Sequence, residues 1–234
     1  MVIAGALKID PMPEPREVGL GTLPLGSESS VTGLVTQQKE RLAPEGGALI
    51  RTMDLVLSSV LLILSLPLLL VVAIVIKVES PGPIIYSQVR VGQYNRTFRL
   101  YKLRTMRVGT PEVAKEALAD GLGAYVTRVG AVLRKTSIDE LPQLLNVLRA
   151  DMSLVGPRPA LHNQVDLISM RTDVGVHMAR PGITGIAQVR GREDLPLELK
   201  VAYDHELVQS LGPALYIQLL LQTAVAVLTA RGAY

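Results

Sequence analysis

The feature that most constrains this chain is a run of 22 residues without a charged side chain, Leu55–Ile76. At 1.5 Å per residue, a straight helix of this length reaches about 33 Å, enough to cross a bilayer core of about 30 Å. The composition points the same way, because 48% of the 234 residues are hydrophobic and only 3% are aromatic. The sequence therefore predicts one domain that is attached to a membrane.

The residues of this run leave open how it meets the membrane. Pro67 lies just past its middle, with Ser65 two residues earlier, and a proline inside a helix removes a backbone hydrogen bond and kinks the chain. Basic residues are more numerous after the run than before it, which favours the cytoplasmic side for the C-terminal flank. The charges of the N-terminal flank do not decide on which side of the membrane that flank lies. Two arrangements remain: a helix that spans the bilayer, and a bent hairpin that re-enters the same leaflet.

Composition divides the chain into three parts. Residues 1–47 are rich in proline and glycine and keep no apolar period, so we expect a disordered or loosely attached tail. Residues 48–79 contain the membrane segment, and residues 80–234 form the remaining domain. Near its end, Pro213–Thr229 is uncharged but too short and polar for a span, so we expect it in the membrane interface or packed on the membrane helix.

Several classes of site are disfavoured by composition. The chain has no cysteine, which excludes disulfides, thiolate metal sites and a cysteine nucleophile. His162, His177 and His205 are spaced in no metal-binding pattern and are predicted to be ordinary surface or loop residues. The net charge is only +3 and aromatic residues are scarce, so the sequence does not predict a nucleic-acid partner.

A basic, turn-rich stretch follows the membrane segment. Seven basic residues, against one acid, lie in residues 77–107, and Lys102 and Arg104 are among them. One interpretation is a collar that binds anionic lipid head groups. The other is a cluster that binds a phosphate-bearing substrate at the membrane surface. The sequence leaves both open.

An adjacent pair of carboxylates precedes a predicted helix. Four leucines at helical spacing indicate an amphipathic helix over Glu140–Arg149. In a capping box, Ser137 would cap the helix and the Glu140 side chain would accept a hydrogen bond from the Ser137 N–H, which would give Glu140 a structural role. Pro142 instead favours Asp139 as the cap. The proline then lies in the first turn of the helix, where backbone N–H groups have no partner within the helix and a missing N–H costs nothing. At a helix N-terminus Asp139 stays ionised, and with Glu140 it can share a Mg²⁺ ion that bridges to a diphosphate.

Five residues outside the acidic pair are weighed as site candidates. Arg158 lies between two prolines, which limits its backbone freedom and suits a bidentate grip on phosphate. Arg134 is a second-rank phosphate partner, as is the Arg104 guanidinium. Arg180 begins a glycine-containing loop that is either a tight turn or part of a nucleotide site. Asp204 is predicted to be a charge on a helix surface.

Eight short motifs occur in order along residues 48–234. They are Arg51-Thr-Met-Asp54, Ser80-Pro-Gly-Pro83, Gln88-Val-Arg90-Val-Gly92, Tyr101-Lys-Leu-Arg104-Thr-Met106, Asp139-Glu-Leu-Pro-Gln143, Asn146-Val-Leu148, Met152-Ser-Leu-Val-Gly-Pro-Arg-Pro159 and Arg180-Pro-Gly-Ile-Thr-Gly185. Together they resemble the bacterial sugar transferases, the polyprenyl-phosphate hexose-1-phosphate transferases also called monotopic phosphoglycosyl transferases. The terminal Gly232-Ala-Tyr234 resembles the exopolysaccharide galactosyl-phosphate transferase branch of that family.

The resemblance implies a reaction and roles for the acidic pair. A hexose 1-phosphate would pass from a UDP-sugar to undecaprenyl phosphate at the cytoplasmic face of the bacterial inner membrane, with release of UMP. Asp139 would be the nucleophile that forms a covalent phosphosugar intermediate, and Glu140 would help to bind Mg²⁺. The membrane helix would break near Ser65 and Pro67 and re-enter the same leaflet. Membrane lipids and a second copy of the chain are further candidate partners.

The expected fold is a helix-rich α+β monotopic membrane protein. A re-entrant N-terminal helix and interfacial amphipathic helices would surround a small catalytic domain, with Lys102, Arg104, Arg134, Arg158 and Arg180 as candidate substrate-binding cations. The alternative function is a membrane-anchored, non-catalytic adaptor of a polysaccharide assembly complex. The intact acidic pair favours the enzyme, and galactose or glucose is the expected sugar.

Overall fold

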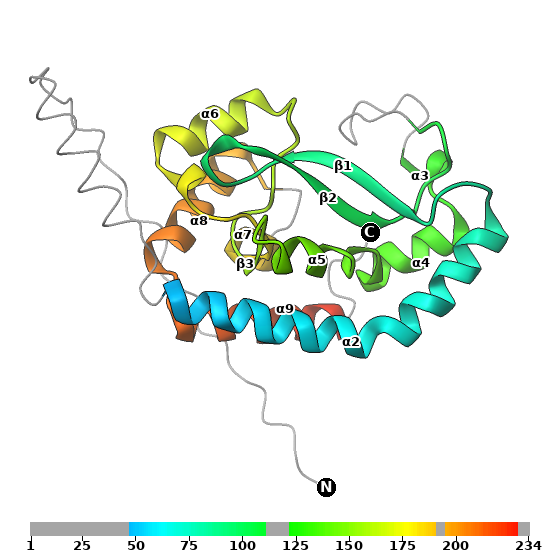
Figure 1. Cartoon of the computed structure of the whole chain (residues 1–234). Coiled ribbons are helices and arrows are strands. Elements are labelled where there is room, and N and C mark those ends of the chain that lie inside the picture. The colour runs from blue at the N-terminus through cyan, green and yellow to red at the C-terminus, as the bar shows by residue number, and fades with distance from the viewer. Residues whose placement is uncertain (1–46, 111–121, 191–194, 229–234) are drawn as a thin grey trace, which may run out of the picture.

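The computed structural model describes residues 47–110, 122–190 and 195–228, so the predicted tail over residues 1–47 lies almost entirely outside the described residues. The described part is a helix-rich mixture of helices and two small two-stranded sheets, as predicted (Figure 1). The elements in chain order are α2 (Gly47–Glu79), β1 (Ile85–Val91), η1 (Gln93–Asn95), β2 (Thr97–Leu103), α3 (Leu122–Tyr125), α4 (Arg128–Thr136), η3 (Ile138–Glu140), α5 (Gln143–Leu148), β3 (Ser153–Val155), α6 (Val165–Asp173), η4 (Val176–Met178), β4 (Gly182–Thr184), α7 (Ile186–Arg190), α8 (Leu197–Ser210) and α9 (Pro213–Leu228).

The predicted membrane segment lies within α2, a single helix of 33 residues that contains Pro67. Figure 1 shows that α2 runs along the base of the domain and changes direction near its middle. Pro67 has no N–H to donate to the preceding turn, and the Ser65 hydroxyl donates to the Leu62 carbonyl at 2.9 Å. The helix therefore changes direction near its middle and remains one helix from Gly47 to Glu79.

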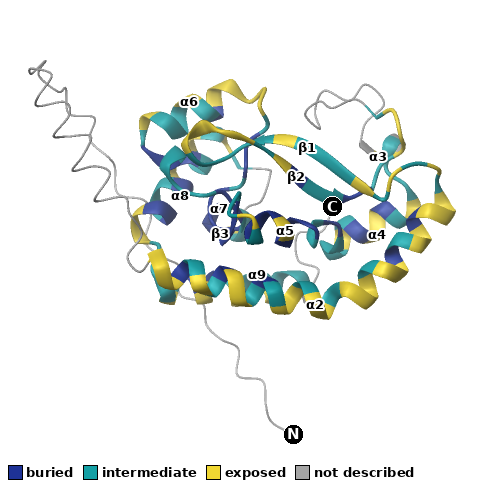
Figure 2. Ribbon diagram, in the orientation of Figure 1, coloured by how far each residue is buried: buried dark blue, intermediate teal, exposed yellow. Residues whose placement is uncertain are grey.

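Only the two ends of α2 are buried in the domain. Ile50, Asp54 and Ser58 are buried near its start, and Val72 and Ile76 near its end. Between them the side chains are mostly exposed, and only 6% of the most apolar 18-residue window is buried (Figure 2). In the described part of the chain α2 is the one helix long and apolar enough to cross a membrane. Its exposed apolar surface is compatible with membrane association.

Helix α9 packs beside α2 and presents a second apolar face. Ile217, Leu221 and Val225, spaced four residues apart, are exposed along one side of α9. On the opposite side Tyr216 and Leu219 are buried in the main core. The face of α9 that points away from the domain is therefore apolar, as expected for a helix that lies in a membrane interface.

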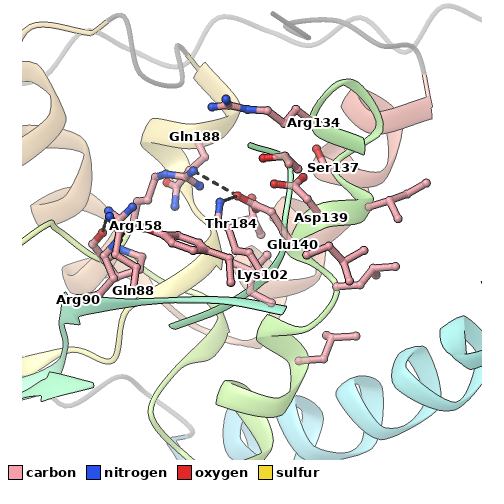
Figure 3. A pocket seen from close by; sticks show the side chains of 18 of the residues that line it. Gln88, Arg90, Lys102, Arg134, Ser137, Asp139, Glu140, Arg158, Thr184 and Gln188 are labelled. Carbon is pink, nitrogen blue, oxygen red and sulfur yellow. Dashed lines mark hydrogen bonds and ion pairs between the residues drawn. The ribbon is translucent and has the colours of Figure 1, made fainter. Parts of the chain in front are cut away.

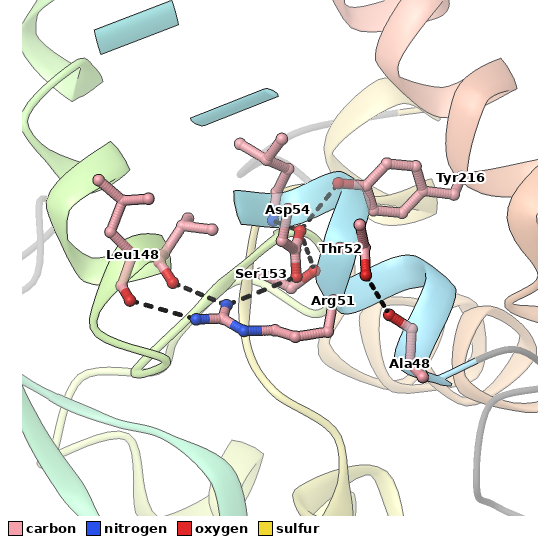
Figure 4. A network of polar contacts seen from close by, with 9 residues as sticks. Ala48, Arg51, Thr52, Asp54, Leu148, Ser153 and Tyr216 are labelled. Atoms are coloured by element: carbon pink, nitrogen blue, oxygen red, sulfur yellow. Dashed lines mark hydrogen bonds and ion pairs between the residues drawn. The ribbon is translucent and has the colours of Figure 1, made fainter. Parts of the chain in front are cut away.

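The main core joins α5, β3, α7, α8 and α9 to the start of α2. Its buried members are Ile50, Leu100, Leu144, Val147, Met152, Leu154, Val155, Ile186, Leu207, Tyr216 and Leu219. A polar network fastens α2 to this core (Figure 4). One oxygen of Asp54 accepts from the Ser153 hydroxyl at 2.9 Å, the Leu154 N–H at 2.8 Å and the Tyr216 hydroxyl at 2.8 Å. Burial raises the pKa of the Tyr216 phenol, and so does the charge of Asp54, so Tyr216 remains a donor.

Each of the two small sheets pairs two strands, and side-chain or backbone contacts fix each pair. β1 and β2 pair antiparallel from Ile85 opposite Leu103 to Val91 opposite Thr97, and the buried Asn146 side chain accepts from the Tyr101 N–H at 3.1 Å. β3 and β4 pair parallel, and a Cβ on Gly182 would lie 2.0 Å from the Gly156 nitrogen. Only glycine permits this close approach of the start of β4 to the residue that follows β3.

Candidate active site

A cavity of about 1390 Å³ lies between the β1–β2 hairpin, the α4–α5 connection and helices α2, α7, α8 and α9. The wall that α2 and α9 provide is almost entirely apolar, with Leu57, Leu61, Leu220 and Val227 among its residues. Other parts of the lining carry the acidic pair and several cations, which Figure 3 shows converging on one region. The cavity therefore offers both an apolar surface and a charged centre to a ligand.

The acidic pair lies in the 3₁₀ turn η3, between α4 and α5. Ser137 joins α4 to η3 in the left-handed conformation, with φ of 57°, and its side chain caps neither element. The capping box, the alternative weighed for this pair, does not form, because the Glu140 carboxylate accepts from two cations instead. The prediction of Asp139 as helix cap is wrong: α5 begins at Gln143, after Pro142, and Asp139 lies inside the tighter turn.

Glu140 is held by two cations on a single oxygen. The Lys102 Nζ donates to Oε1 at 2.7 Å and an Nη of Arg158 donates to the same oxygen at 3.2 Å (Figure 3). Burial disfavours the charged carboxylate, but the charges and hydrogen bonds of Lys102 and Arg158 outweigh it and hold the pKa of Glu140 well below its usual range. Glu140 is therefore a fixed, ionised group.

Asp139 lies beside Glu140 in a different electrostatic state. The residue is only 6% exposed, and no described residue donates a hydrogen bond to its carboxylate. Burial raises the pKa of Asp139, while the Lys102 charge opposes this and the Glu140 charge adds to it. Neighbouring carboxyls whose environments shift their pKa values in opposite directions are typical of sites where the two have different tasks.

The predicted cations fall into two groups. Lys102, Arg134 and Arg158 line the cavity near the acidic pair, and the charges of all three lower the pKa of Asp139. The buried Arg104 also lines the cavity, but its guanidinium donates to the carbonyls of Ser80 and Pro81, both at 2.7 Å, and so holds the loop after α2.

Arg180 is placed differently from these cations. It is not among the residues that line the cavity, and its carbonyl lies against Gly156. The structure thus brings Lys102, Arg134 and Arg158 to the acidic pair and leaves Arg180 outside this group.

Asp204 corrects a prediction about the surface. It is only 1% exposed on α8, and its Oδ2 accepts from Nε of Arg171 at 2.9 Å and from an Nη at 2.5 Å. Sequence reasoning missed Arg171 entirely. A signal was present for Asp204, because it shares a helical face with the apolar residues Val201, Leu207 and Val208, which are also buried.

The comparisons with known proteins decide the family. The profile described as bacterial sugar transferase matches residues 46–230. The chain belongs to the bacterial sugar transferase family. The sugar transferase is 44% identical over 193 residues to the UDP-glucose:undecaprenyl-phosphate glucose-1-phosphate transferase of Caulobacter vibrioides, covering 79% of this chain and 71% of the relative. The resemblance predicted from the eight motifs is thereby confirmed.

Two further relatives differ in their named roles. The transferase is 35% identical over 214 residues to the exopolysaccharide production protein ExoY of Rhizobium meliloti, covering 86% of this chain and 94% of the relative. It is 39% identical over 198 residues to the undecaprenyl-phosphate galactose phosphotransferase of Salmonella typhimurium, covering 79% of this chain and 41% of the relative. The family is therefore common to relatives named for different sugars.

Proposed function

We propose that this transferase moves a hexose 1-phosphate from a UDP-sugar to undecaprenyl phosphate, as the first membrane step of exopolysaccharide or other glycoconjugate synthesis. The observation that carries the proposal is the cavity, in which a carboxylate pair with three cations shares one space with the apolar wall of α2 and α9. Cationic side chains suit phosphate oxygens, and an apolar wall suits a polyprenyl chain. The names of the relatives in Caulobacter and Salmonella support both substrates.

The proposed chemistry has two displacement steps at one phosphorus atom. A carboxylate oxygen of Asp139 attacks the phosphorus that bears the sugar, the bond from that phosphorus to the UMP oxygen breaks, and UMP leaves with the electron pair. A phosphate oxygen of undecaprenyl phosphate then attacks the same phosphorus. The aspartyl–phosphorus bond breaks, the carboxylate is regenerated, and the product is a polyprenyl diphosphate sugar. Asp139 suits the role because described residues leave its carboxylate unbonded.

The neighbouring cations have distinct proposed tasks. Lys102 and Arg158 keep Glu140 ionised and fixed, and each has further N–H groups for phosphate oxygens. Arg134 lies in the last turn of α4 near the acidic pair and would add positive charge where the departing UMP gains negative charge. These groups would stabilise charge that develops during the displacement without rearrangement of the site.

Mg²⁺ is the proposed cofactor, held by Glu140 and Asp139. The donor set fits, because Mg²⁺ is usually bound through one or two carboxylates and completes its shell with substrate phosphates and water. Ionised Glu140 is in the state that a ligand needs. When bound, the ion supplies positive charge that neutralises the diphosphate of the donor.

We further propose that α2 re-enters one leaflet at the cytoplasmic face of the inner membrane. Ile50 at the start of α2 packs into the main core, and Ile76 near its end packs into a second core with Leu103 and Leu133. Both ends thus contact the same domain, while the apolar middle, which contains Pro67, is mostly exposed outside it. This arrangement supports a helix whose ends remain on one side of the membrane.

The proposed function is tested by release of UMP from a panel of UDP-sugars by the full chain in lipid nanodiscs with Mg²⁺. We expect UMP release from UDP-glucose or UDP-galactose that requires added undecaprenyl phosphate for more than one turnover. Lipid-linked sugar diphosphate should accumulate in equal amount. A folded protein that binds the lipid phosphate but turns over no sugar on the panel would favour the adaptor function.

Lys102→Met is expected to move the acidic limb of the pH–rate profile to higher pH. The Lys102 charge favours the ionised forms of Asp139 and Glu140, so its loss raises both pKa values, and a higher pH is needed to keep the carboxylates ionised. Initial rates measured across acidic and neutral pH check this. Lys135→Met, an equal charge change on the exposed side of α4, should leave the limb in place. An unmoved limb in both variants would contradict the assignment.

A further inference from the structure

The loop that carries Arg158 is held by backbone hydrogen bonds on either side of it, because the Pro157 carbonyl accepts from the Gly182 N–H at 2.9 Å and the Ala160 carbonyl accepts from the Val91 N–H at 3.0 Å. Pro157 and Pro159 have no N–H to donate, so this loop has few backbone hydrogen bonds to give. The Arg158 side chain is aimed at Glu140, with which it shares a hydrogen bond at 3.2 Å, and it is 37% exposed to the cavity side. Between these two backbone contacts, the carbonyls of Arg158 and Pro159 accept from side chains instead.

Two arginines from other elements hold consecutive carbonyls of this loop. An Nη of Arg171, on α6, donates to the Arg158 carbonyl at 2.8 Å. An Nη of Arg90, on β1, donates to the Pro159 carbonyl at 3.1 Å. The two contacts reach the loop from helix α6 and from the hairpin, so they fix its position from separate elements.

Asp204 and Gln88 fix the two arginines in turn. Asp204 accepts two N–H groups of Arg171 on one oxygen, and both side chains are nearly buried, at 1% and 11% exposure. The Gln88 side chain accepts from Nε of Arg90 at 3.1 Å. A guanidinium held on one edge by a carboxylate or amide keeps its other edge directed at the carbonyl. The chain of contacts therefore runs from α8 through Arg171 to the Arg158 loop.

We propose that Arg171, anchored by Asp204, and Arg90 are positioning residues that hold Arg158 in the geometry required to bind the diphosphate of the substrate. This inference rests on the proposed function, in which Arg158 contacts phosphate oxygens. Arg171 and Arg90 also line the cavity, but the proposed role does not require either of them to touch the substrate. Their effect passes through the two carbonyls, and a displacement of about 1 Å in a binding group can cost on the order of 100-fold in rate.

The test is a double-mutant cycle between Arg171 and Arg158, read by the Kd for UDP and by kcat/KM for the UDP-sugar. Arg171→Met is expected to weaken UDP binding by roughly tenfold or more, as for the loss of a charged hydrogen bond. In an Arg158→Met background the same substitution should weaken binding no further, because the group it positions is gone. A structural role alone would give equal losses in both backgrounds.

Two further variants keep the test independent of folding. Arg171→Met with Asp204→Asn removes the donor without leaving a buried unpaired carboxylate, and it should show the same loss of UDP affinity with a smaller loss of thermal stability. Arg190→Met removes an arginine that pairs with Glu206 and stacks on the Tyr203 ring outside the cavity lining, and it should leave the affinity for UDP unchanged. Equal UDP affinity in wild type and the folded Arg171→Met variant would overturn the proposal.

UDP binding also separates this inference from the proposed function. If the wild type binds UDP and the cycle is non-additive but no UDP-sugar is turned over, the positioning role stands and the transfer reaction fails. If the wild type binds UDP and Arg158→Met binds it equally well, Arg158 does not contact phosphate and the positioning proposal fails, whatever the turnover.

Discussion

Asp139→Asn is expected to abolish sugar-phosphate transfer by a protein that remains folded. The amide cannot form the bond to phosphorus, so we expect loss of at least about 10³-fold in turnover. Because burial raises the pKa of Asp139, its charge opposes folding at neutral pH: the stability it contributes is present at low pH and is lost as the pH rises through the raised pKa. The free energy of unfolding at neutral pH should therefore stay the same or rise. UMP release and thermal unfolding in the same nanodiscs measure both effects.

A contrast with Glu140→Gln sharpens this prediction. That variant should also lose activity, but it leaves Lys102 and Arg158 without their ionised partner and should lower the melting temperature. Asp173→Asn, at an exposed aspartate on α6, is the matched control and should change neither quantity. Near-normal turnover by Asp139→Asn would mean that the lipid phosphate attacks the UDP-sugar directly, without a covalent intermediate.

The residues of the acidic site could be predicted from local sequence motifs, but their contacts with one another could not. The adjacent carboxylates and the arginine between two prolines are visible as motifs, and the structure brings them together. Lys102 and Arg158 lie 38 and 18 residues from Glu140, and both bind the same oxygen of it. No local pattern predicts that convergence, because it depends on how β2 and the loop after β3 pack around η3.

The predicted start of helix α5 was wrong because of the conformation of the residues just before it. The leucine spacing correctly indicated a helix, but its start was set at Glu140 rather than Gln143. Pro142 allows two solutions, a helix that begins just before it or a tighter turn that ends before a new helix begins. The chain takes the second, since Ser137 adopts a left-handed conformation that no cap pattern specifies.

Buried charges were the hardest residues to predict. Asp204 and Arg104 were both treated by residue type, as a surface charge and as a phosphate ligand. Each is buried because a distant partner satisfies it, Arg171 for Asp204 and the Ser80 and Pro81 carbonyls for Arg104. Charged residues are buried only when paired, and the pair becomes visible only once the fold has brought its members together.

Asp54→Ala is expected to cause a large loss of stability. It would leave three buried donors, on Ser153, Leu154 and Tyr216, without an acceptor. An unsatisfied buried group costs about 1–3 kcal/mol, and loss of one buried charged partner costs about 3–5 kcal/mol, so we expect a loss of about 3–5 kcal/mol in the free energy of unfolding. Thermal and denaturant unfolding in a common lipid environment measure this loss.

Tyr216→Phe is a milder variant for comparison, because it removes one hydrogen-bond donor and leaves the donors of Ser153 and Leu154 on Asp54. Its expected cost is about 1 kcal/mol. Release of the start of α2 also moves Leu57 and Leu61, which line the cavity, so Asp54→Ala should impair turnover with the lipid substrate even below its melting temperature. Equal free energies of unfolding for the two variants would show that Asp54 stabilises the packing of α2 only through Tyr216, and that its hydrogen bonds with Ser153 and Leu154 of β3 contribute nothing to stability.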